Sequence, residues 1–355
     1  MAFMMSQSLR QAASPVPEAP AVPDNRLVTV DDLNVRFLSR DGDVSILNGV
    51  SFTLDRGEVL CLLGESGSGK SVTLRALMRL LPGNARISGR LEVDGHDIAA
   101  MKESQLRPLR GSTVAMIFQE PMTALDPVFT IGQQITETLR AHKGLSGGAA
   151  RKRALELLEL VQIPNAPARL KAYPHELSGG LRQRAMIALA LSCDPKLLLA
   201  DEPTTALDAT VQIQVLLLLR ELQKELGMAT VFVTHDIGVA CEIADRVGVM
   251  YAGRLVEGAD VGRIIKEPLH PYTSALMRST VHAGMRGQVL DSIPGAPPDL
   301  AALPPGCAFA PRCQSARSLC VQDEPASTSL PAGRTVRCHI HGAEAAWRTS
   351  PPLAE

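Results

Sequence analysis

The stretch "EVLCLLGESGSGKS", residues 58–71, decides the class of fold. Its apolar run is typical of a strand buried on both faces. From residue 64 onward it matches G-x-x-x-x-G-K-[ST], and a helical pattern follows over 70–81. Glycines let backbone N–H groups converge on phosphates, and the helix adds its positive end. A glycine-rich turn that only connects two elements is the weaker reading, because strand and helix flank the motif. We therefore expect a nucleotide phosphate site made of Gly64, Glu65, Ser66, Gly67, Ser68, Gly69, Lys70 and Ser71, with Lys70 on the β- and γ-phosphates and Ser71 on Mg²⁺.

A second motif, "LLLADE" at residues 197–202, supports this expectation. Asp201 ends an apolar strand, where a carboxylate beside the phosphate loop can hold Mg²⁺ through water. Glu202 follows and can orient or deprotonate the attacking water. A capping pair before Pro203 is the alternative, and the phosphate loop argues against it.

Strand-like and helix-like patterns alternate along the chain. Residues 26–37, 113–119 and 230–236 are expected to form strands, and residues 247–258 a closing strand or hairpin. Residues 121–191 are mostly helical, with an amphipathic stripe over 151–163. These patterns predict an α/β core with a helical insertion.

The segment "HELSGGLRQR", residues 175–184, resembles the signature motif of ABC ATPases. The other motifs of that family stand in order around it, over about residues 26–258. Gln119 resembles the Q-loop glutamine, residues 206–208 the D-loop with Asp208, and His235 the switch histidine. Phe37 lies where the family places an aromatic ring that stacks on adenine. The resemblance implies a P-loop NTPase core of the ABC ATPase type, a RecA-like sheet plus an antiparallel β part.

Functional roles follow from the same resemblance. Gln119 and His235 are expected to contact the γ-phosphate beside Glu202, and Gln119 to join Ser71 and Asp201 around Mg²⁺. The segment Ser178, Gly179 and Gly180 precedes a helix, whose donor-rich N-terminus suits an anion. The family closes it on the ATP of an opposing subunit. Each motif also has a purely structural interpretation when taken alone. Residues 178–180 could form an ordinary N-cap, and Gln119 and His235 could be polar residues at strand ends. Phe37 could be a core residue.

Four further segments resemble the oligopeptide/dipeptide (peptide/nickel) importer branch of this family. They are "QEPMTALDP" (119–127), Leu181 after the two glycines, "HPYT" (270–273) and "IPGAPP" (293–298). This branch implies a second, paralogous ATPase as heterodimer partner, two membrane permease subunits and an extracytoplasmic substrate-binding protein. It also implies a place at the cytoplasmic face of the cell membrane. Peptides are the expected cargo, and nickel chelates or another small solute remain open.

A cysteine cluster marks the C-terminal part of the chain. Its spacing contains no C-x₂-C pair, so it leaves metal binding and free thiols both open. The resemblance implies a [4Fe–4S] cluster on four cysteines. Zinc is the alternative, with His339 or His341 as substitute ligands. The cysteines are Cys307, Cys313, Cys320 and Cys338.

Composition sets the remaining bounds. Residues 1–25 are expected to be a disordered leader. Residues 26–260 are expected to form the ATPase domain, with a helical subdomain over about 120–192. Residues 261–345 are expected to form an appendage of turns that does not extend the sheet, and residues 346–355 a tail. The sequence has no apolar run long enough for a membrane-spanning helix, and its first residues lack the pattern of a secretory signal, so neither is expected. A net charge of −1 argues against nucleic acid as main partner. A soluble ABC ATPase acting on DNA or ribosomes is therefore a remote alternative, and intact catalytic residues argue against a subunit without turnover.

Overall fold

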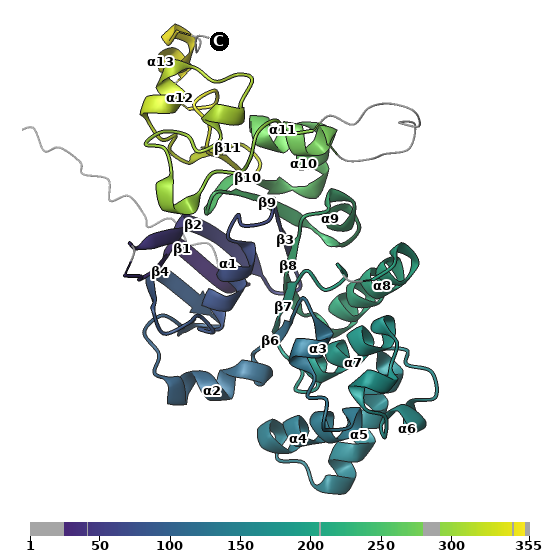
Figure 1. The fold of residues 1–355 in the computed structure, drawn as a ribbon. Coiled ribbons are helices and arrows are strands. Elements are labelled where there is room, and N and C mark those ends of the chain that lie inside the picture. Colours follow the sequence, from purple (N-terminus) through teal and green to yellow (C-terminus); the bar gives the residue numbers. More distant parts are fainter. Residues whose placement is uncertain (1–24, 41, 206, 280–291, 343, 352–355) are drawn as a thin grey trace, which may run out of the picture.

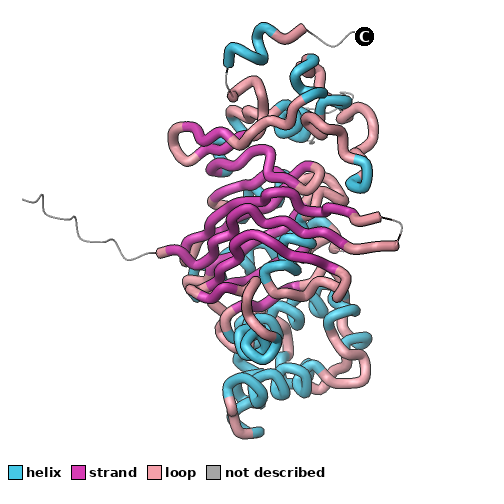
Figure 2. The backbone as a smooth tube through the Cα atoms, turned by 90° about the vertical axis from the view of Figure 1, so that its left-hand side faces the viewer, coloured by secondary structure: helices cyan, strands magenta, loops and turns pink. Residues whose placement is uncertain are grey.

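The computed structural model describes residues 25–40, 42–205, 207–279, 292–342 and 344–351. Two β-sheets occupy the centre of the molecule. The helical segment (residues 121–191) lies at one end and the C-terminal region (the described residues from 261 onward) at the other (Figures 1 and 2). Of the expected leader only Asn25 is described, and the last four residues of the expected tail lie outside the described residues.

The smaller sheet has four antiparallel strands in the order β2-β1-β4-β5. Its first strand covers the same residues as the expected strand, burying Leu33 and Val35. This sheet is the antiparallel part that the family resemblance implied. The strands are β1 (Arg26–Phe37), β2 (Val44–Asp55), β4 (Ala85–Val93) and β5 (His96–Asp97).

The larger sheet contains eight strands in the order β11-β12-β10-β9-β3-β8-β7-β6. The five strands from β9 to β6 run parallel. The expected burial of β3 on both faces is confirmed, because Leu60 and Leu62 join one hydrophobic core while Cys61 and Leu63 join the other. The parallel strands are β3 (Val59–Leu63), β6 (Val114–Ile117), β7 (Leu197–Asp201), β8 (Ala229–Thr234) and β9 (Arg246–Tyr251).

Helices cover both faces of this sheet. Helix α1 (Lys70–Leu77) lies between the two sheets and contacts strands of both, and α2 (Glu103–Ser112) precedes β6. The helical segment lies near β6 and β7, the strands that precede and follow it in the chain (Figure 1). It contains α3 (Pro121–Ala124), α4 (Ile131–Lys143), α5 (Gly147–Leu160), α6 (Ala166–Arg169), the 3₁₀ helix η1 (Pro174–Glu176) and α7 (Gly179–Leu191); α8 (Ala209–Leu226) and α9 (Ile237–Ile243) follow.

The C-terminal region does extend the larger sheet, so that part of the sequence expectation is wrong. The expected hairpin of β9 and β10 (Arg254–Asp260) is confirmed, and β12 pairs with the free side of β10 at Glu257 and Gly258. The two added strands are three residues long, too short to show an alternating pattern. The region contains α10 (Val261–Lys266), α11 (Pro271–Arg278), η2 (Leu300–Ala302), η3 (Ala310–Arg312), α12 (Ser318–Gln322), β11 (Thr328–Leu330), β12 (Arg334–Val336) and α13 (Glu344–Thr349).

A buried carboxylate lies where this region joins the core. The Glu257 side chain on β10 is fully buried and accepts hydrogen bonds from the backbone N–H groups of Leu269 and His270. The guanidinium of Arg334 on β12 lies 3.4 Å from the same carboxylate. One side chain therefore connects the core sheet, the start of α11 and the added strand.

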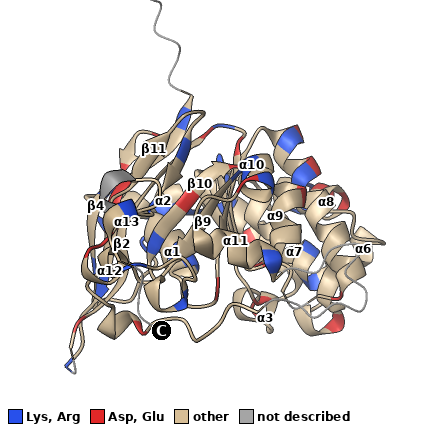
Figure 3. Cartoon of the chain, turned by 90° about the horizontal axis from the view of Figure 1, so that it is seen from above, with Lys and Arg blue, Asp and Glu red and all other residues tan. Residues whose placement is uncertain are grey.

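Two properties of the whole fold bear on its partners. Among the described residues, no helix combines the length and the apolar character that crossing a membrane requires. Basic and acidic residues are interspersed in the view of Figure 3, in keeping with the near-neutral sequence.

Candidate nucleotide-binding site

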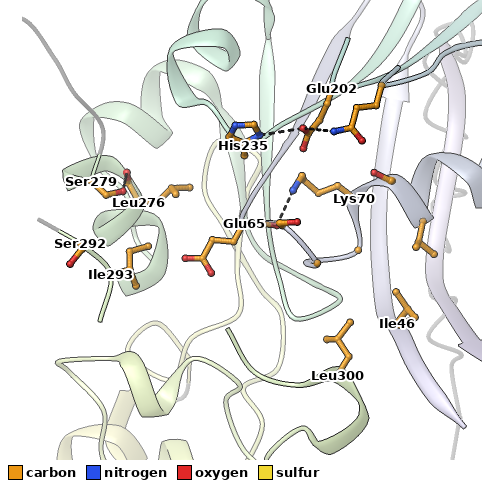
Figure 4. Close-up of a pocket in the computed structure, with 16 residues that line it drawn as sticks. Ile46, Glu65, Lys70, Glu202, His235, Leu276, Ser279, Ser292, Ile293 and Leu300 are labelled. Atoms are coloured by element: carbon orange, nitrogen blue, oxygen red, sulfur yellow. Dashed lines mark hydrogen bonds and ion pairs between the residues drawn. The ribbon is translucent and has the colours of Figure 1, made fainter. Parts of the chain in front are cut away.

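The predicted catalytic and phosphate-binding residues meet at one edge of the larger sheet. Parallel strands present their carboxyl ends at the same edge, where open α/β sheets bind ligands. The phosphate loop follows β3, and Gln119 follows β6. Asp201 ends β7 with Glu202 directly after it, and His235 follows β8. A cavity of about 980 Å³ opens there (Figure 4). It is lined by Ile46, Glu65, Ser66, Gly67, Gly69, Lys70, Ser71, Val72, Gln119, Glu202, His235, Leu276, Ser279, Ser292, Ile293 and Leu300.

The phosphate loop needs glycine at two positions for steric reasons. A Cβ atom at Gly64 would lie 2.3 Å from the carbonyl oxygen of Met250. Gly69 has a φ of 102°, in the left-handed region, and a Cβ there would lie 2.6 Å from the side chain of Leu47. The loop therefore packs directly against β9 and β2, which holds its N–H groups in a curl.

The position of the Lys70 side chain shows that this curl fits phosphate. The Lys70 ammonium donates to the carbonyl oxygens of Gly64 and Glu65 at 2.7 and 2.9 Å, so it lies over the loop. Burial lowers the pKa of Lys70, and the carboxylates of Glu202 and Asp201 oppose that shift. The Ser68 hydroxyl is buried without a hydrogen-bond partner among the described residues. Neither Ser68 nor Gly64 is among the residues that line the cavity, so the phosphate contact of the Ser68 side chain stays a prediction.

A pair of oxygen donors fits Mg²⁺. The Ser71 hydroxyl donates to a carboxylate oxygen of Asp201 at 2.7 Å. Burial raises the pKa of Asp201, and the bond from Ser71 opposes the rise. Hydroxyl and carboxylate oxygens are the ligands that Mg²⁺ prefers beside substrate phosphates. The structure thus brings these two predicted ligands together, with Gln119 nearby on the cavity wall.

The three predicted catalytic residues lie together, with the Glu202 carboxylate between Gln119 and His235. The carboxylate accepts from the Thr205 hydroxyl at 3.0 Å and from the Gln119 amide at 3.4 Å. The same oxygen lies 3.4 Å from Nδ1 of His235, whose side chain is 54 % exposed. Glu202 itself has a φ of 45°, a conformation that non-glycine residues rarely adopt. The Glu202 side chain lines the cavity, where its carboxylate can hold a water molecule.

The signature motif and Asp208 lie apart from this cavity. Ser178 is the N-cap of α7, and a Cβ at Gly180 would lie 2.7 Å from the Val211 side chain. Asp208 caps α8 by accepting from the Val211 N–H at 3.0 Å. The triplet of residues 178–180 and the start of α8 are thus packed together, and none of these residues lines the cavity. Ala206 of the D-loop lies outside the described residues.

Phe37 also lies outside the cavity lining. It is partly buried at the end of β1 and packs against the core, whereas Ile46 of the neighbouring strand lines the cavity. Its stacking role stays a prediction.

Sequence reasoning missed the part of the wall that the C-terminal region supplies. Leu276, Ser279, Ile293 and Leu300 line the cavity from that region. The available signals were the two motifs at residues 270–273 and 293–298, which had no assigned role.

The four cysteines of the C-terminal region gather without forming a single-ion site. The pKa of Cys307 is raised to about 11 and that of Cys338 to about 12, mainly by burial, and the other three cysteines contribute to the rise at Cys338. They therefore lie within electrostatic range of one another. In the described part of the chain, no three His, Cys, Asp or Glu side chains are grouped as one metal ion requires.

Comparisons with known proteins agree with this geometry. Residues 47–205 match the ABC transporter family, and residues 256–320 match the family "Oligopeptide/dipeptide transporter, C-terminal region". The oligopeptide transport ATP-binding protein OppD of Salmonella typhimurium is 46 % identical over 331 residues, which cover 93 % of this chain and 97 % of that protein. The dipeptide transport ATP-binding protein DppD of Bacillus subtilis is 44 % identical over 317 residues, which cover 89 % and 95 %.

A solved structure shows the same core. The ATP-binding cassette MJ0796, in a dimeric post-hydrolysis state bound to ADP and Pi, superposes with a TM-score of 0.60 at 28 % identity, covering 66 % of this chain and 99 % of that one. The resemblance and the fold class expected from the sequence are thus confirmed. This chain belongs to the ATP-binding proteins of ABC transporters, in the oligopeptide/dipeptide transporter branch, and it is an ATP-hydrolysing enzyme.

Proposed function

We propose that this chain hydrolyses ATP to drive the import of di- or oligopeptides through an ABC importer. The observation that carries the proposal is the C-terminal region, which matches the oligopeptide/dipeptide transporter region over residues 256–320 and is built into the ATPase sheet. Relatives named for peptide transport cover nearly the whole chain.

The site residues support a division of roles in ATP hydrolysis. Lys70 and the loop N–H groups would bind the β- and γ-phosphates. Ser71, Asp201 and Gln119 would hold Mg²⁺, which when bound neutralises phosphate charge. Glu202 would orient the attacking water and take its proton, while Gln119 and His235 hold the carboxylate and contact the γ-phosphate.

A second ATPase subunit is part of the proposal. The segment 178–180 and Asp208 lie off this chain's own cavity, so they are available to an ATP molecule bound by an opposing subunit. The structurally similar MJ0796 cassette is a dimer. We infer a paralogous partner, because Leu181 stands after the two glycines.

The membrane partners would dock beside Gln119. Three large apolar side chains follow it and are exposed: Met122 at 44 %, Val128 at 70 % and Phe129 at 45 %. Exposed apolar side chains on one short stretch mark an interaction surface. We assign it to two permease subunits, which would place the chain at the cytoplasmic face of the membrane, with a substrate-binding protein on the other side.

We also propose a [4Fe–4S] cluster on Cys307, Cys313, Cys320 and Cys338. The support is the gathering of the four thiols, since Cys307, Cys313 and Cys320 all act electrostatically on Cys338 and such clusters are held by four Cys thiolates. Zinc is the alternative ion, because the Nε2 contacts of His339 and His341 with backbone carbonyl oxygens leave Nδ1 of each ring to bind a metal. Iron and sulfide analysis after anaerobic purification tests the proposal, and folded, colourless, iron-free protein would contradict it.

Transport is tested by ATPase activity in membranes that contain the chain, its permeases, its partner ATPase and the substrate-binding protein. Stimulation by a peptide panel is the expected result. Stimulation by nickel chelates alone, or co-purification with nucleic acid instead of permeases, would overturn the peptide assignment.

A further inference from the structure

The first variable residue of the phosphate loop, Glu65, is held from three sides. Its N–H donates to the hydroxyl of Tyr272 at 2.9 Å, and its carbonyl oxygen accepts from Lys70. Its two carboxylate oxygens accept from Arg312 at 2.9 and 3.1 Å. Tyr272 and Arg312 both belong to the C-terminal region, so two of the three contacts come from outside the ATPase core.

Arg312 is built into its position. Its side chain is 6 % exposed, and its guanidinium lies 5.8 and 5.9 Å from the ring centres of Tyr251 and Phe309. It also donates to the Tyr251 hydroxyl at 3.2 Å. A bidentate, charge-assisted pair of this kind is strong and fixes direction.

The same guanidinium also holds the opposite wall of the cavity. Its Nε donates to the carbonyl oxygen of Pro294 at 2.8 Å. Pro294 follows Ile293, which lines the cavity, and the same loop continues to Leu300 on the lining. In Figure 4, Glu65 extends from the phosphate loop toward the side where Ile293 lies. One buried side chain thus joins the phosphate loop to the loop of residues 292–300.

We infer that Arg312 is a positioning residue of the ATP site, through which the C-terminal region sets the conformation of the phosphate loop and hence the affinity for ATP. The inference rests on the ATP-binding function of the chain. Arg312 acts through Glu65, because the carboxylate of Glu65 is the phosphate-loop group that it contacts among the described residues. By thermodynamic linkage, bound ATP must stabilise the contact between Arg312 and Glu65 by the same free energy that this contact adds to ATP binding.

The test uses the full chain and compares Arg312→Met, Glu65→Gln and the double variant. Glu324→Gln is the matched control, because it breaks another ion pair between the core and the C-terminal region, Arg254 to Glu324 at 2.6 Å. Dissociation constants are measured with a fluorescent ATP analogue and by competition with inorganic tripolyphosphate. Unfolding midpoints are measured alongside.

We expect both single variants to bind ATP and tripolyphosphate about 3- to 30-fold more weakly, the range that coupling residues produce. The double variant should lose no more affinity than the weaker-binding single variant, because both single substitutions remove the same interaction between Arg312 and Glu65. The control should keep wild-type affinity.

Three outcomes would overturn the inference. Arg312→Met could bind ATP like the wild type, even with a lowered midpoint, which would make Arg312 structural only. The losses of the two single variants could add, which would exclude action through Glu65. If Arg312→Met does not fold, Arg312→Lys replaces it, and full affinity in that variant would contradict the need for a bidentate contact. Absence of ATP binding in the wild type would instead refute the nucleotide assignment itself.

Discussion

Replacing Glu257 by alanine tests how the C-terminal region is joined to the ATPase core. The wild-type carboxylate is fully buried and accepts from the N–H groups of Leu269 and His270, with Arg334 at 3.4 Å. Alanine removes the acceptor of both N–H groups. Arg334 still contacts the backbone carbonyl oxygen and the carboxylate of Glu267 in this variant, so its positive charge retains a partner.

The magnitude follows from the two orphaned groups. Each buried donor without a partner costs about 1–3 kcal/mol, so the expected loss in the free energy of unfolding is about 2–6 kcal/mol. If water enters the space left by the side chain and accepts from the two N–H groups, the loss in the free energy of unfolding should be at the lower end of this range. At about 2 °C per kcal/mol for a large domain, the unfolding midpoint should fall by roughly 4–12 °C.

Thermal and urea unfolding, followed by circular dichroism, measure this loss. Glu257→Gln is the matched variant, because its amide oxygen can still accept from the backbone, and it should lose clearly less than Glu257→Ala. A midpoint for Glu257→Ala within a degree or so of the wild type, about the scale of a surface substitution, would refute the reasoning. It would mean that the junction does not depend on this carboxylate.

Three further outcomes are expected. Glu202→Gln should slow ATP hydrolysis by roughly 10²–10⁴-fold, with ATP binding retained in a filter assay; normal turnover would remove Glu202 as the base. Burial raises the pKa of Asp201 above its ordinary 3.8, so acidification protonates it earlier than an ordinary Asp. Mg²⁺-dependent ATP binding should therefore weaken as pH falls from neutral. A Mg²⁺ titration whose midpoint does not change with pH would count against Asp201 as a Mg²⁺ ligand. In iron-free protein, the half-buried Cys307 and Cys338, with pKa values of about 11 and about 12, should be alkylated by iodoacetamide more slowly than exposed Cys241. Equal rates by peptide mapping would contradict this difference in exposure.

The sequence predicts the features that depend on neighbours along the chain. The apolar run before Gly64 and the position of Glu202 after β7 are local patterns, so strand, loop and carboxylate are found where expected. The contact between Glu65 and Arg312 joins residues 247 positions apart. Only the folded chain reveals such a pair, because neither residue belongs to a pattern with the other. The same holds for β12, whose three residues carry no periodic signal.

The pairing of β12 with β10 has a consequence for shortening this protein. A truncation that ends after Asp260 would keep every catalytic motif, yet it would leave β10 with a row of unpaired N–H and C=O groups. An uncovered strand of that kind is a template for another chain, so the truncated ATPase should aggregate more readily than the full chain. It would also bare the apolar side chains of Tyr251 and Val256, which the C-terminal region helps to bury. The catalytic core of this protein is therefore not a detachable module, although its motifs all end before the C-terminal region begins.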